Sequence, residues 1–191
     1  MSFLKSSLHP VISNFIDSKK FIVIYGPPAT GKTHLAFEVV KYLLSKSLKV
    51  SFIATESSTL TFARHVYNDL NIRAVITKEQ LLKEVILSTL SNEFIVIDSI
   101  NWLFRSFNDE TAEKELSFIS SLLSLMGGFA TGQISEIDEE SKMSMDTWVL
   151  PWVKVVGITK KFKEGLIELK IERPINLVLE YRITRDGVMW I

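Results

Sequence analysis

The stretch Gly26-Pro27-Pro28-Ala29-Thr30-Gly31-Lys32-Thr33 stands directly behind the apolar run Phe21-Ile22-Val23-Ile24-Tyr25. A lysine at the start of a helix is unfavourable on its own, because that end of the helix already carries partial positive charge. An anion held between the helix and the lysine removes the conflict. The Gly-x-x-x-x-Gly-Lys-Thr spacing between a strand and a helix is that of the P-loop, so it predicts a phosphate-binding loop.

The residues of this loop have separate physical roles in the prediction. Gly26 lets the chain leave the strand in a conformation that other residues resist, and Gly31 leaves room for phosphate. Lys32 supplies positive charge to the β- and γ-phosphates, and the Thr33 hydroxyl is a predicted Mg²⁺ ligand. The expected cofactors are ATP and Mg²⁺. The predicted nucleotide-binding residues of the loop are Gly26, Pro27, Pro28, Ala29, Thr30, Gly31, Lys32 and Thr33.

Continuous apolar runs alternate with segments of helical periodicity over the first 150 residues, which is typical of a parallel sheet with helices on both faces. Beyond Pro151, four short apolar segments joined by tight turns predict an antiparallel β-meander that extends the same sheet. We therefore predict a single α/β domain over residues 1–191, with a helical segment at 1–20 and the meander at 151–191.

Composition and charge limit the classes of function. Basic and acidic residues number 22 each, so the chain has no global field that would draw it onto nucleic acid or an acidic membrane. The absence of cysteine excludes disulfides and thiolate metal sites. The uncharged stretch Leu116–Ser135 is interrupted by serines and glycines, which favours a buried helix and a strand over a membrane span. We expect a cytoplasmic protein without membrane contact.

Three polar residues stand at the ends of predicted strands, where ligands bind in parallel sheets. Asp98 closes an apolar run and is the predicted acid for the Mg²⁺ water shell. Glu56 is either the base that activates the attacking water or a helix cap. Gln133 is either a sensor of the γ-phosphate that relays its presence to the next loop, or a solvated glutamine.

These segments together resemble the RecA/RadA recombinase family. Ile53-Ala54-Thr55-Glu56 is similar to the family's second-strand motif, which ends in the catalytic glutamate. Residues 97–105 are similar to its Walker B segment, and Ala130-Thr131-Gly132-Gln133 to the strand that ends in its switch amide. The resemblance implies a RecA-like P-loop NTPase core from about residue 20 to the end of the chain.

The resemblance also implies roles for individual residues. Glu56, Lys32 and Gln133 would be the catalytic residues, and Thr33 and Asp98 would hold the metal. An arginine follows the glutamate in the family, so Arg64 would stack on the adenine; the alternative is a solvated helix charge.

The sequence departs from the recombinases in the two loops that hold single-stranded DNA. These correspond to residues 105–115 and 134–146, and acidic residues outnumber basic ones in both. Because phosphate binding depends on Lys and Arg contacts, such loops would repel a DNA strand. We expect no DNA-binding domain ahead of the core, and with that expectation the pattern looks most like the core-only archaeal RadA paralogues, including the RadB type.

The sequence is compatible with three functions. The first is an ATP-binding, slowly hydrolysing RadA paralogue that modulates homologous recombination with a recombinase or another paralogue as partner, and with weak DNA binding at most. The second is a nucleotide-gated protein-binding module with little catalysis, whose surface would include Trp148 and Trp152. The third is a small-molecule P-loop kinase, for which the sequence offers no arginine-rich lid.

Overall fold

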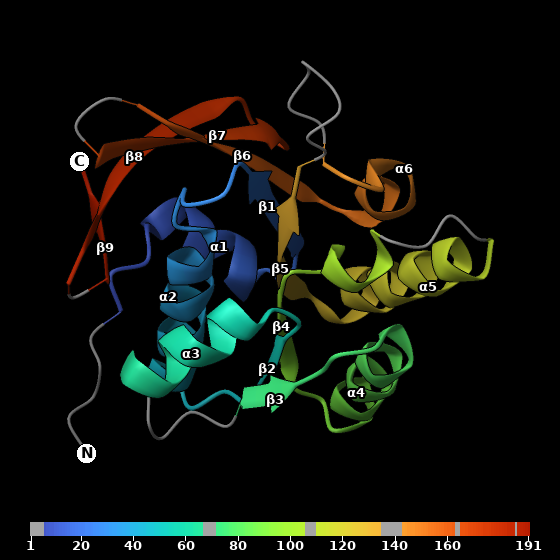
Figure 1. The fold of residues 1–191 in the computed structure, drawn as a ribbon. Coiled ribbons are helices and arrows are strands. Elements are labelled where there is room, and N and C mark those ends of the chain that lie inside the picture. The colour runs from blue at the N-terminus through green and yellow to red at the C-terminus, as the bar shows by residue number, and fades with distance from the viewer. Residues whose placement is uncertain (1–5, 67–71, 106–109, 135–142, 163–164, 186) are drawn as a thin grey trace.

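The computed structural model describes residues 6–66, 72–105, 110–134, 143–162, 165–185 and 187–191, with the main chain alone at 62–66. The described strands form one sheet in the order β3-β2-β4-β5-β1-β6-β7-β8-β9 (Figure 1). Their bounds are β1 Phe21–Gly26, β2 Val50–Ala54, β3 Ile72–Ala74, β4 Phe94–Asp98, β5 Gly128–Gln133, β6 Val155–Lys161, β7 Leu166–Arg173, β8 Leu177–Thr184 and β9 Gly187–Trp190.

Helices cover both faces of the parallel part of the sheet. On one face lie α1, α2 and α3, and on the other α4, α5 and α6 (Figure 1). Their bounds are α1 Pro10–Asp17, α2 Lys32–Ser45, α3 Ser57–Val66, α4 Lys78–Leu90, α5 Glu110–Met126 and α6 Asp146–Val149, with 3₁₀ turns η1 at Trp102–Phe104 and η2 at Leu150–Trp152. None of the described helices has the length and apolarity needed to cross a membrane.

The parallel part of the sheet is the half that positions the functional residues. β1 lies between β5 and β6 and is parallel to both, and every residue of β1 is buried. β4 pairs in parallel with β2 on one side and β5 on the other. The carboxyl ends of β1, β2, β4 and β5 therefore meet at one edge, as the sequence predicts for a binding site.

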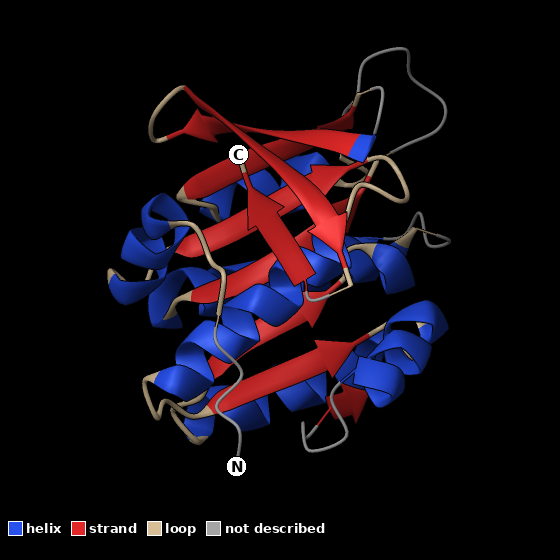
Figure 2. Cartoon of the chain, turned by 90° about the vertical axis from the view of Figure 1, so that its left-hand side faces the viewer, coloured by secondary structure: helices blue, strands red, loops and turns tan. Residues whose placement is uncertain are grey.

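The C-terminal strands form the predicted meander. β6, β7, β8 and β9 pair in antiparallel fashion in chain order, and β6 joins this part to β1. Alternate residues of β7 and β8, including Leu169 and Tyr181, are buried in the core cluster that also holds α2. The strand that leads to the C-terminus lies in front of the parallel part of the sheet in Figure 2. The meander thus curves over α2 and reaches the loop that precedes it. The predicted α/β sheet with an antiparallel extension is confirmed.

Two predicted boundaries are wrong. The meander predicted from residue 151 begins instead at Val155, because Leu150–Trp152 form η2, where Pro151 has no N–H for a sheet ladder. The segment 105–115, predicted as a loop, enters α5 at Glu110. Acidic residues in the first turn of α5 suit the positive end of the helix dipole. Residues 106–109 and 135–142, with most of the predicted acidic loop charges, lie outside the described residues.

Candidate functional site

The loop between β1 and α2 is shaped by two glycines. Gly26 has φ +152° and Gly31 has φ +74°, a region that residues with a side chain rarely adopt. A Cβ at Gly26 would lie 2.3 Å from the Thr159 hydroxyl, and one at Gly31 would lie 2.6 Å from Cδ1 of Ile183. The two glycines are therefore required by packing against β6 and β8, in addition to the predicted room for phosphate.

Thr30 is the point at which the meander braces the loop. Its hydroxyl donates to the Pro27 carbonyl at 2.9 Å and lies 2.7 Å from the Thr159 hydroxyl. Its carbonyl accepts a hydrogen bond of 2.7 Å from the Tyr181 hydroxyl of β8, which is fully buried. These bonds satisfy buried polar groups of the loop and fix its path.

Lys32 begins α2 and turns its ammonium back into the loop. The side chain is 6% exposed, and Nζ donates to the carbonyls of Gly26 at 2.8 Å and Pro27 at 2.7 Å. Burial lowers the pKa of Lys32 to about 8, although the charges of Asp98 and Glu56 act in the opposite direction. An anion in the loop would stabilise the protonated lysine, which fits a phosphate.

Asp98 ends β4 and is 3% exposed. Three hydroxyls donate to its carboxylate: Thr33 at 2.8 Å and Thr59 at 2.7 Å to Oδ2, and Thr131 to Oδ1. Burial raises the pKa of Asp98, the three hydroxyls oppose that rise, and the charge of Glu56 adds to it. A cation beside Asp98 would therefore stabilise its ionised form.

The oxygen atoms at this position fit Mg²⁺. Thr33 and Asp98 offer one hydroxyl and one carboxylate next to the phosphate loop, and Mg²⁺ sites commonly use one or two carboxylates together with substrate phosphates. Among the described residues there is no group of three or more His, Asp or Glu that would favour an all-protein metal cage. The predicted metal ligands thus lie together.

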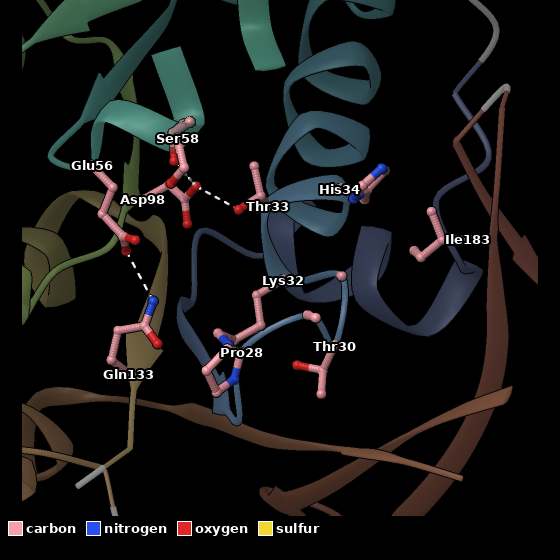
Figure 3. Close-up of a pocket in the computed structure, with 13 residues that line it drawn as sticks. Pro28, Thr30, Lys32, Thr33, His34, Glu56, Ser58, Asp98, Gln133 and Ile183 are labelled. Atoms are coloured by element: carbon pink, nitrogen blue, oxygen red, sulfur yellow. Dashed lines mark hydrogen bonds between the residues drawn. The ribbon is translucent and has the colours of Figure 1, made fainter. Parts of the chain in front are cut away.

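Glu56 and Gln133 face each other across the same edge of the sheet (Figure 3). Gln133 Nε2 donates to Glu56 Oε1 at 3.0 Å, and the Ser99 hydroxyl donates to the same oxygen at 2.8 Å. Glu56 lies between β2 and α3, and Gln133 is the last residue of β5. The structure therefore brings the predicted base and the predicted sensor into direct contact.

These residues surround a cavity of about 490 Å³, which is in the size range of small-molecule sites. Glu56 and Gln133 lie at one end, and His34 and Ile183 lie on the other side of the loop (Figure 3). The lining residues are Pro28, Ala29, Thr30, Gly31, Lys32, Thr33, His34, Glu56, Ser58, Thr59, Asp98, Gln133 and Ile183. Of the predicted binding residues, Gly26 and Pro27 are not in this lining, and the side chain of Arg64 lies outside the described part of the chain.

Sequence reasoning missed several residues of the site. Thr59 and Thr131 hold Asp98, and Ile183 enters the cavity from the meander. Thr131 stands two residues before Gln133 in a buried strand, where a hydroxyl is a usable signal for a polar partner. No local signal marks Thr59 or Ile183, since their roles depend on segments distant in sequence.

Comparison with known proteins identifies the family. A family model described as "ATPase family associated with various cellular activities (AAA)" matches residues 22–171, which include the loop, Glu56, Asp98 and Gln133. A curated relative, the vacuolar protein sorting-associated protein 4 of Dictyostelium discoideum, is 26% identical over 149 residues. That alignment covers 77% of this chain and 29% of the relative, so the chain spans under a third of the relative's length.

The family match overturns the predicted membership in the RecA/RadA recombinases, including the core-only RadA paralogues. The short motifs that carried that resemblance reflect the shared chemistry of P-loop ATPases and do not separate the families. A recombination function and a recombinase partner have no support in the comparisons. The chain belongs to the AAA family of ATPases.

Proposed function

We propose that residues 1–191 act as a single Mg²⁺-dependent ATPase domain with the triphosphate held by the Gly26–Thr33 loop. The observation that carries the proposal is that Lys32 and Asp98 both line one cavity. Burial disfavours the charged form of both side chains. A phosphate chain would stabilise the protonated Lys32, and a divalent cation would stabilise the ionised Asp98. Mg·ATP supplies both partners together.

Each side chain takes a defined role in this proposal. Lys32 binds phosphate oxygens, and Thr33 and Asp98 hold the metal. When bound, Mg²⁺ neutralises charge that develops on the phosphate oxygens. Glu56 orients the attacking water and takes its proton, and Gln133 lies beside Glu56 where an amide can contact the terminal phosphate.

Hydrolysis by the chain alone is proposed to be slow. Among the described residues that line the cavity, Lys32 is the one lysine or arginine. Phosphoryl transfer is commonly accelerated by a second cationic side chain, worth on the order of 10³–10⁵ in rate. We propose that a neighbouring protein or a second copy of the chain supplies that charge.

The same observation favours a second candidate, a nucleotide-gated binding module with little catalysis. Its predicted surface is only partly available: Trp152 is 39% exposed and donates to the Ser117 hydroxyl, whereas Trp148 packs against the core. A kinase is less well supported, since no arginine appears among the described lining residues.

The decisive experiment compares wild type with Glu56→Gln. Steady-state hydrolysis of Mg·ATP should fall at least about 100-fold in this variant, because the general base is lost, while ATP affinity stays within about twofold. Glu180→Gln, at an exposed position of β8, is the matched control and should hydrolyse at the wild-type rate. Equal rates for Glu56→Gln and wild type would remove Glu56 from catalysis, and binding without turnover in wild type would favour the gated module.

A further inference from the structure

Asn101 is a fully buried polar residue between β4 and η1, outside the lining of the cavity. Its amide makes three hydrogen bonds to main-chain atoms. Oδ1 accepts from the N–H of Gln133 at 2.9 Å, and Nδ2 donates to the carbonyls of Gln133 at 2.8 Å and Ser144 at 2.9 Å. Both amide hydrogens and the amide oxygen are thus engaged.

These bonds continue the pairing of β4 with β5 beyond the end of β4. The N–H of Ile100 donates to the Thr131 carbonyl at 2.9 Å. Gln133 lies two residues after Thr131 in β5, and its main-chain N–H and carbonyl bond the Asn101 side chain where a neighbouring strand would otherwise pair. A primary amide can serve both the N–H and the carbonyl of one residue, since it carries a donor and an acceptor. The main chain at Gln133 is therefore fixed by a side chain.

Gln133 transfers this restraint to Glu56. Its side-chain amide and the Ser99 hydroxyl both donate to Oε1 of Glu56, at 3.0 Å and 2.8 Å. Two donors on one oxygen hold the orientation of the carboxylate. A shift of the Gln133 main chain would move its amide and loosen Glu56.

Asn101 also connects Gln133 and Ser144, the residues on either side of the segment 134–143. Ile134 and Met143 form an isolated antiparallel bridge, and the N–H of Ser144 donates to the Gln133 carbonyl at 3.0 Å. The Asn101 amide contacts both Gln133 and Ser144, so the residues on either side of that segment share one buried anchor.

We propose that Asn101 is a positioning residue for ATP hydrolysis. It fixes the main chain of Gln133 so that the Gln133 side-chain amide can hold the Glu56 carboxylate. Its hydrogen bond to the Ser144 carbonyl also fixes the position of Ser144 relative to Gln133. The inference rests on the proposed function, because it assigns a role in the step that Glu56 performs. Asn101 is not among the residues that line the cavity, so the role assigned to it acts through Gln133.

A double-mutant cycle on the full chain tests the proposal. Asn101→Ala should lower kcat for ATP about 10- to 100-fold, because small displacements of a catalytic group cost rate steeply, while ADP affinity stays within about twofold. In a Gln133→Ala background the same substitution should lower kcat by less than about twofold, since the intermediary is already absent. An unchanged kcat in the single variant, or an equal further loss in the double variant, would overturn the proposal.

Ser120→Ala is the matched control for loss of a buried polar side chain. Its hydroxyl is fully buried and donates to the Leu116 carbonyl in α5, away from the cavity. It should leave kcat unchanged. A loss of kcat in Ser120→Ala equal to that in Asn101→Ala would mean that general destabilisation explains both.

Hydrogen exchange in the wild-type chain tests the anchor without hydrolysis and without a variant that must fold. The side-chain NH₂ of Asn101 and the main-chain N–H groups of Gln133 and Ser144 should exchange at least about 100-fold more slowly than exposed amides. Rapid exchange of the Asn101 amide would overturn the proposal. If wild type hydrolyses no ATP while these amides are protected, the proposed function fails and the anchor stands.

Discussion

The Tyr181 hydroxyl donates a 2.7 Å hydrogen bond to the Thr30 carbonyl, joining β8 to a loop 151 residues earlier in the chain. Both groups are buried, so neither can exchange this bond for water. Tyr181 also packs against Trp190 of β9, with ring centroids 5.2 Å apart. The phosphate loop is thus supported from behind by the C-terminal meander.

Tyr181→Phe should destabilise the chain by about 1 kcal/mol, because the Thr30 carbonyl loses its partner in a buried place. ATP affinity should fall a few-fold as the loop relaxes. Urea unfolding and calorimetric titration measure the two effects. Tyr42→Phe is the control, since the Tyr42 hydroxyl bonds Asp17 at an exposed position; it should leave ATP affinity unchanged. Equal affinities for Tyr181→Phe and wild type would show that the brace does not shape the loop.

Lys32→Ala should abolish ATP binding. The ammonium is the one lysine or arginine charge in the described cavity lining, and the backbone amides alone leave the phosphate charge largely unbalanced. Calorimetric titration with Mg·ATP checks the outcome, and Lys160→Ala, an exposed position on β6, serves as the control. ATP affinity that survives the loss of Lys32 would remove the phosphate assignment of the loop.

Nucleotide affinity should depend on pH through Lys32. Its pKa is lowered to about 8 without nucleotide, and phosphate raises that pKa because it stabilises the charged form. Binding therefore takes up a proton above pH 8, and affinity falls as pH rises, by up to about tenfold per pH unit. ADP titrations without Mg²⁺, in buffers of different ionisation enthalpy, measure the uptake. Lys32→Arg, which stays protonated, should show none. Wild-type affinity that is flat from pH 8 to 9.5 would contradict the linkage.

Thr59→Val should weaken the binding of Mg²⁺ while preserving side-chain shape. The Thr59 hydroxyl stabilises the charged form of Asp98, so its loss raises the pKa of that carboxyl further and disfavours the metal-binding state. The Mg²⁺ concentration for half-maximal hydrolysis should rise several-fold. Thr61→Val is the control on the same helix, because the Thr61 hydroxyl is exposed and bonds the Ser57 carbonyl. An unchanged Mg²⁺ requirement would mean that Thr59 does not tune the metal site.

The incorrect assignment to the recombinases shows that short motifs can predict the position of an ATPase site but not the protein family. Glu56, Asp98 and Gln133 stand at strand ends, and the ATPase chemistry of several families uses acids and amides at that edge of a parallel sheet. Such motifs locate the site without naming the family. The match over residues 22–171, which draws on the whole stretch, assigns the chain to the AAA ATPases.

The amino-acid sequence by itself determined the phosphate loop, the parallel sheet and the antiparallel extension. These features follow from local spacing and from apolar periodicity, which act over a few residues. It also placed Glu56, Asp98 and Gln133 at one edge, because strand ends in a parallel sheet converge.

Only the tertiary structure decided which side chains hold those groups. Thr59 and Thr131 on Asp98, Tyr181 on Thr30, and Asn101 on Gln133 join segments from 32 to 151 residues apart. The contacts on Asp98 and Thr30 are buried and the contact between Asn101 and Gln133 is part-buried, so folding removes water from these polar groups and they bond to one another instead. The sequence of a single segment does not predict such a contact, because the packing of distant strands and helices determines which side chains meet.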